Sequence, residues 1–151
     1  MGLIGLMSRS YLEYIHPENL HQYWDDLKSD IELVLDRSNS SVEWIPEDVY
    51  MSIKQNTSYV IVGFDGESNS WLGSIVLTPQ PGYCGLELHI WTLCNRTDHC
   101  LIQNHMDDIV GFAKKLGAKK LTFSSNRKGW NRAGKRLGFI PTLQQYELRV
   151  T

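Results

Sequence analysis

One stretch near the C-terminal end constrains the fold more than any other part of the chain. Residues 119–139, KKLTFSSNRKGWNRAGKRLGF, are typical of a strand, a polar loop and a short basic helix that ends at Leu-Gly-Phe. An apolar helical segment precedes them and ends at Gly117, and glycine is a natural cap for a helix C-terminus. This alternation of helix and strand predicts an α/β fold around a shared sheet.

The remaining sequence extends this pattern over one domain. A chain of 151 residues is most simply a single domain, predicted at residues 10–151 after an apolar N-terminal arm at residues 1–9. Alternating hydrophobicity predicts strands at 10–15, 58–64, 71–78, 85–93, 119–124 and 143–150. Apolar steps of three and four predict helices at 17–35, 46–55, 99–116 and 129–137. The order β-α-α-β-β-β-α-β-α-β predicts a mixed α/β fold with a central mixed sheet.

Composition limits the classes of partner. The chain is 42% hydrophobic and 21% charged, which is ordinary for a soluble globular domain. A net charge of -2 argues against nucleic acid as a partner, although the segment from Arg127 to Arg136 is locally basic. No apolar run is long enough to span a membrane, and the start MGLIGLM is too short for a secretory signal peptide.

The order of elements, with LGAKKLTFSSN and RAGKRLGF, resembles the GNAT superfamily of acyl-coenzyme A N-acyltransferases. The resemblance covers nearly the whole chain, from about Tyr11 to Val150. More narrowly, the strings IPEDVY, ELHIWTL and KGW…LGF resemble the small GNAT-like proteins of tailed bacteriophages, which often have degenerate coenzyme loops. That resemblance implies a protein of the host cytoplasm or the phage virion, with other virion proteins as partners through the N-terminal arm.

The resemblance also places the coenzyme site. In a working member the fourth strand splays from the fifth, and the pyrophosphate rests on N–H groups at the start of the next helix. The signature Arg/Gln-x-x-Gly-x-Gly/Ala falls on Arg96-Thr97-Asp98-His99-Cys100-Leu101. Arg96 matches, but His99 and Leu101 replace the small residues that let the backbone approach a phosphate. Asp98 is suited to cap the helix. The resemblance implies a damaged loop, with Arg127 as a residual contact near the adenosine end.

The catalytic positions of the superfamily are also altered. Many members carry a tyrosine, the general acid, at the position of Gly134. The usual base is a carboxylate, or a water held by one, near the fourth strand. Glu87 is the acidic residue of the predicted strand, and alternation puts it on the same face as His89. These two side chains are candidates for a general base acting through water, or for a polar pair on the solvent side of the sheet.

Four residues have side chains that suit zinc: Cys94, His99, Cys100 and His105. Their spacing matches no zinc finger or knuckle, and His99 and His105 stand six positions apart, so they do not share a helix face. The sequence therefore predicts no metal site, and a cysteine–histidine nucleophile pair lacks a supporting third group.

Two functions remain open. The first is a non-catalytic, phage-encoded virion or assembly protein that acts through protein contacts and needs no cofactor, and a homo-oligomer is compatible with it. The second is an acetyl-coenzyme A-dependent N-acyltransferase with a divergent loop, which uses Arg96 for the pyrophosphate and Glu87 as the base.

Overall fold

A five-stranded sheet forms the centre of the molecule. The computed structural model describes residues 9–38, 42–125 and 129–150. The strands lie in the order of the chain: β1 (Ser10–Ile15), β2 (Tyr59–Asp65), β3 (Trp71–Gly82), β4 (Gly85–Asn95) and β5 (Lys120–Phe123). The first four form an antiparallel meander, and β5 is parallel to β4. The predicted mixed α/β fold is therefore confirmed.

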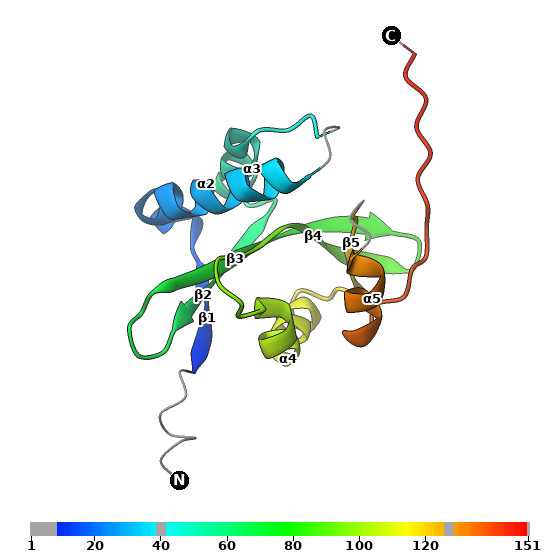
Figure 1. Cartoon of the computed structure of the whole chain (residues 1–151). Coiled ribbons are helices and arrows are strands. Elements are labelled where there is room, and N and C mark those ends of the chain that lie inside the picture. The colour runs from blue at the N-terminus through cyan, green and yellow to red at the C-terminus, as the bar shows by residue number, and fades with distance from the viewer. Residues whose placement is uncertain (1–8, 39–41, 126–128, 151) are drawn as a thin grey trace.

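Helices cover both faces of this sheet (Figure 1). One face carries α2 (Leu20–Arg37) and α3 (Pro46–Lys54), which follow a short 3-10 turn, η1 (Pro17–Asn19). The other face carries α4 (Leu101–Lys115) and α5 (Gly129–Arg136). None of the helices in the described part of the chain is long and apolar enough to cross a membrane.

Alternation along the strands divides the core into two layers. Val60 and Val62 of β2 point to the layer under α2 and α3, whereas Ile61 between them points to the layer under α4. Each central strand thus supplies apolar side chains to both sides, which is why β2 and β3 read as nearly continuous apolar runs.

Strand β4 departs from regular pairing where it approaches the candidate site. Its register with β3 shifts between Val76 and Leu77, where a bulge lies. Strand β5 pairs with β4 only from Glu87 to Ile90, although β4 continues to Asn95. The pairing stops there because β5 itself ends at Phe123, so the splay that the GNAT resemblance implies stays a prediction.

Most boundaries differ from the predicted ones by one to three residues, and two differences bear on the site. Strand β3 continues through Pro79 and Pro81 instead of ending there. It tolerates them because its pairing with β2 stops at Leu77, so one edge is free beyond that point. Helix α4 begins at Leu101 rather than at residue 99.

The predicted last strand, 143–150, is wrong in this structure. Residues 139–150 form no strand, and Figure 1 shows them as an extended segment that leaves the domain. Its apolar side chains are 84% to 94% exposed: Leu143, Tyr146, Leu148 and Val150. Alternation reports a side-chain pattern, but a strand also needs a partner edge, and this segment lies along none. Of the predicted N-terminal arm, only Arg9 belongs to the described residues.

Candidate functional site

The predicted pyrophosphate loop joins β4 to α4, and side chains of the loop and of the end of β4 accept hydrogen bonds from two of its N–H groups. The N–H of Leu101, the first residue of α4, donates to Asn95 Oδ1 at 2.9 Å. The N–H of His99 donates to Thr97 Oγ1 at 3.1 Å. Asn95, which the sequence analysis missed, therefore caps the helix in the place expected for Asp98. Two donors at the helix start are already satisfied before any ligand arrives.

Leu101 explains why a large residue stands in the loop. Its side chain is fully buried and packs against β2 at Gly63, where an added Cβ would collide with it. The first turn of α4 is therefore fixed to the sheet by a core contact. At this position the family signature has a small residue, and this chain has a core residue instead.

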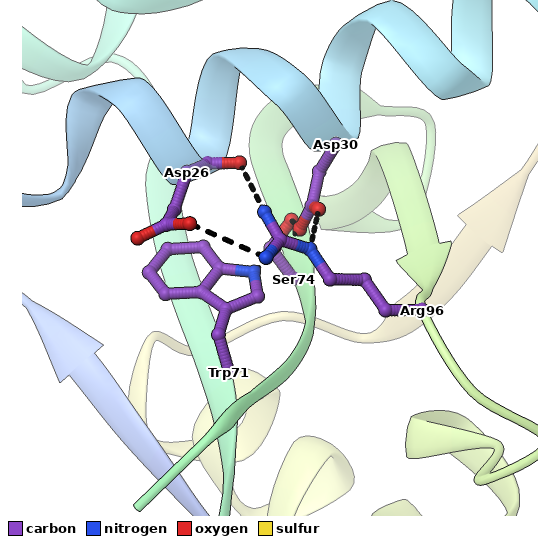
Figure 2. A network of polar contacts seen from close by, with 5 residues as sticks. All are labelled: Asp26, Asp30, Trp71, Ser74 and Arg96. Carbon is purple, nitrogen blue, oxygen red and sulfur yellow. Dashed lines mark hydrogen bonds and ion pairs between the residues drawn. The ribbon is translucent and has the colours of Figure 1, made fainter.

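The guanidinium of Arg96 is directed at α2 (Figure 2). Its Nε donates to Asp30 Oδ1 at 2.6 Å, and its two terminal nitrogens donate to Asp26 Oδ1 at 3.2 Å and the Asp26 carbonyl at 2.8 Å. The charged group also lies 5.3 Å from the centre of the Trp71 ring. Burial lowers the pKa of Arg96, but the bonds and charges of Asp30 and Asp26 outweigh it, so the pKa is raised.

Asp30 is the centre of this network and is only 1% exposed. Besides Arg96 it accepts hydrogen bonds from Trp71 Nε1 at 2.8 Å and Ser74 Oγ at 2.6 Å. Burial, together with the nearby Asp30 charge, raises the pKa of the Cys94 thiol to about 11, which keeps it neutral. The network ties α2 to β3 and to the end of β4. A signal was available in the sequence, since Asp30 interrupts the apolar stripe between Leu27 and Ile31.

Glu87 and His89 lie together on β4 beside β5, as alternation predicts. The Glu87 carboxylate is 3.9 Å from Lys120 Nζ, and His89 Nδ1 is 2.8 Å from Thr122 Oγ1. Burial lowers the pKa of His89 below its ordinary value, and the Glu87 charge opposes this only in part. The imidazole is therefore held neutral and is chemically able to accept a proton.

Many GNAT members carry the general-acid tyrosine where this chain has Gly134, and here that position serves packing. Gly134 of α5 is buried, and an added Cβ would meet Phe123 and Phe139 at ordinary contact distances. Arg127 and Lys128 lie outside the described residues. The side chains of Arg132, Lys135 and Arg136 are exposed on α5, so the predicted basic surface is present in its described half.

The two histidines near this loop do come together, contrary to the helix-face argument. His99 Nε2 lies 2.7 Å from Ser10 Oγ, and His105 Nε2 lies 2.6 Å from the same atom. They meet because His99 precedes the helix and His105 departs from helical geometry, with φ -129° and ψ 26°. Across the described residues, no three or more His, Cys, Asp or Glu side chains are grouped to hold a metal ion.

Solved structures with this architecture include acetyltransferases. The ribosomal-protein-alanine N-acetyltransferase of Brucella melitensis biovar Abortus 2308 is 12% identical with a TM-score of 0.66, over 95% of this chain and 100% of that one. An aminoglycoside acetyltransferase from an uncultured soil metagenomic sample, HMB0005, is 8% identical with a TM-score of 0.68, over 95% and 99%. A predicted acetyltransferase of Clostridium acetobutylicum, solved with acetyl-CoA, is 14% identical with a TM-score of 0.66, over 94% and 97%.

Sequence comparison adds nothing to this, because no family model and no curated protein matches the chain. Identities of 8% to 14% are too low to carry an activity from one protein to another, so the likeness concerns architecture. The parallel β5 beside an antiparallel meander, the helices on both faces and the near-complete coverage agree: this chain has the fold of the GNAT acetyltransferases.

Proposed function

We propose that this chain is a GNAT-fold protein without coenzyme A-dependent catalysis, which acts through protein contacts in the virion or the assembly of a tailed bacteriophage. One observation carries the first half of the proposal. The N–H groups of His99 and Leu101, at the start of α4, are hydrogen-bonded to Thr97 and Asn95. A pyrophosphate would have to displace both side chains to reach the donors that a working loop leaves free.

The hydrogen bonds that Arg96 already makes to α2 support the same conclusion. Moving its guanidinium to a phosphate would leave the buried carboxylate of Asp30 without its charged partner. Removing one partner of a buried ion pair costs about 3–5 kcal/mol. Any affinity gained from the phosphate would first have to offset that cost.

Exposed apolar side chains support protein contacts as the mode of action. The segment 143–150 carries four of them, and a second group lies at and before α3: Val42, Ile45 and Met51. Exposed apolar surface of this kind is typical of protein-interaction sites. The N-terminal arm at residues 1–9 is proposed as a further contact, and the phage context rests on the sequence resemblance.

Titration with acetyl-coenzyme A tests the first half. A ligand at about 100 times its dissociation constant adds roughly 2.7 kcal/mol of stability, so even weak binding is visible as a rise in Tm. We expect no heat in calorimetry and no rise in Tm at millimolar ligand, with an active GNAT enzyme as the positive control. Binding that Arg96→Ala abolishes would contradict the proposal.

Detection in particles tests the second half independently. We expect mass spectrometry of purified virions, or of isolated assembly intermediates, to find the chain in a constant ratio to a structural protein. Its absence from both preparations would exclude the virion and assembly role, whatever the result with acetyl-coenzyme A.

The alternative, an acetyl-coenzyme A-dependent N-acyltransferase, is favoured by one observation. Strand β5 ends opposite Ile90, and the neutral His89 lies one residue before that point on β4, with Glu87 beside it. In that case Glu87 acts as the base through water. Glu87→Gln would then lower kcat by about 10²-fold while the affinity for acetyl-coenzyme A stays the same.

A further inference from the structure

A polar cluster between β1 and α4 is used by neither proposal. It consists of Ser10, His99, His105 and Asp108. Ser10 Oγ lies within 2.7 Å of both Nε2 atoms, and the two rings are 6.0 Å apart between centres. His105 Nδ1 is 3.5 Å from Asp108 Oδ2. The cluster joins two elements that are 89 or more positions apart in the chain.

The orientation of the Asn104 side-chain amide sets the direction of the hydrogen bonds in this cluster. Asn104 Nδ2 donates to the Cys100 carbonyl at 2.8 Å, so the same nitrogen faces His99 Nδ1, at 3.5 Å, as a donor. His99 therefore carries its proton on Nε2 and donates to Ser10 Oγ. When the Nδ1–H of His105 faces Asp108, its Nε2 carries a lone pair. The Ser10 hydroxyl then donates to that Nε2. This is the polarity of a serine nucleophile whose base is held by a carboxylate.

The backbone is irregular at the residue that makes this possible. His105 leaves helical geometry within α4, and this turns its ring toward Ser10. Its side chain is only 10% exposed, so water around the reacting nitrogen is limited. Departures from regular geometry of this kind are concentrated at functional sites.

A pocket of about 370 Å³ opens beside the cluster. Its polar end is formed by Ser10, His105 and Asp108, and its apolar walls include Leu12, Ile61 and Phe112. A volume of roughly 300–1,000 Å³ with mainly apolar walls and a few polar groups is typical of small-molecule sites. The volume and the largely apolar lining suit a short apolar acyl group.

We propose that Ser10 is a nucleophile for small esters with apolar acyl groups. Ser10 Oγ bonds to the carbonyl carbon of the ester and its proton passes to His105 Nε2. The bond to the alcohol oxygen then breaks, and the alcohol leaves with that proton. Water, activated by His105, attacks the acyl-serine in the same way, which releases the acid and restores Ser10. Asp108 is a positioning residue that acts through His105.

A fluorophosphonate probe tests the nucleophile directly, because it forms a stable bond only to an activated serine hydroxyl. We expect one equivalent to label the full-length protein, with mass spectrometry placing the adduct on Ser10. Ser10→Ala abolishes labelling, and Ser68→Ala, at an exposed turn serine, leaves it unchanged. His105→Gln can still hydrogen-bond to Ser10 but is a poor base, so it slows labelling at least about 10²-fold.

Ester turnover provides the second readout. With p-nitrophenyl butyrate, Asp108→Asn should lower kcat much more than it changes KM, since Asp108 orients the base and an apolar acyl group gains little from a carboxylate. A merely structural cluster would give a different result: wild-type protein that is not labelled, while Ser10→Ala lowers Tm. Absence of labelling in folded wild-type protein, labelling that survives in Ser10→Ala, or full-rate labelling of His105→Gln would each overturn the proposal.

Discussion

The carboxylate of Asp30 shows how one buried charge determines the behaviour of a residue far away in the chain. It accepts hydrogen bonds from Trp71, Ser74 and Arg96, which lie 41, 44 and 66 positions from it. The sequence predicts the place of Arg96 at the start of the loop, but no local pattern predicts a partner at such a distance. The orientation of the Arg96 guanidinium is therefore set by its hydrogen bonds to α2.

We expect Arg96→Ala to destabilise the fold by about 3 kcal/mol, the lower end for a broken buried pair, because the arginine is 27% exposed. Urea denaturation measures this as a shift of the unfolding midpoint. Arg149→Ala is the matched control, since its pair with Glu43 at 3.7 Å is exposed and its loss should cost no more than about 1 kcal/mol. Equal effects of the two variants would show that Asp30 does not depend on Arg96.

The lowered pKa of His89 gives a prediction about pH. The folded state resists protonating this imidazole, so on acidification below about pH 6.5 the unfolded state binds the proton first and stability falls. His89→Gln can keep a hydrogen bond to Thr122 and cannot titrate. We therefore expect a shallower loss of unfolding free energy than in the wild type on acidification below that pH. Parallel curves for the two proteins would contradict it.

At the scale of elements, the sequence predicts what periodicity can report. The long helices and the strands of the meander lie where apolar spacing places them, because each buries a face of its own. The segment 143–150 has equally clear alternation, yet it forms no strand, since pairing depends on an edge that the pattern does not contain. The same limit applies to His99 and His105, which an irregular residue within α4 brings together.

Deleting residues 143–150 tests how the exposed segment relates to the domain. Its contact with the domain through Arg149 and Glu43 is an exposed ion pair, so the unfolding free energy should change by less than about 1 kcal/mol. Binding of an apolar fluorescent dye should fall, because four exposed apolar side chains are removed. A strong loss of stability would mean that the segment packs on the sheet.

At the scale of the whole molecule, the fold agrees with that of acetyltransferases, but the predicted cofactor loop departs from their signature. The sheet, with β5 parallel to β4, and its two covered faces are those of an acetyltransferase fold, and the resemblance of residues 119–139 predicts this much. The loop that would hold the cofactor is shaped instead by its own hydrogen bonds and by the core. One fold can carry sites of unrelated chemistry, so the architecture does not decide what this loop does.

Asn95 ends β4 and, through its side chain, begins α4. Asn95 therefore links the strand to the helix, and the buried side chain of Leu101 holds the same turn against the core. Replacing Asn95 alone would uncap the helix, and replacing Leu101 alone with a smaller residue would leave a cavity. Phosphate binding by this loop would thus require several substitutions at once, each unfavourable by itself, so single mutations do not easily open the loop.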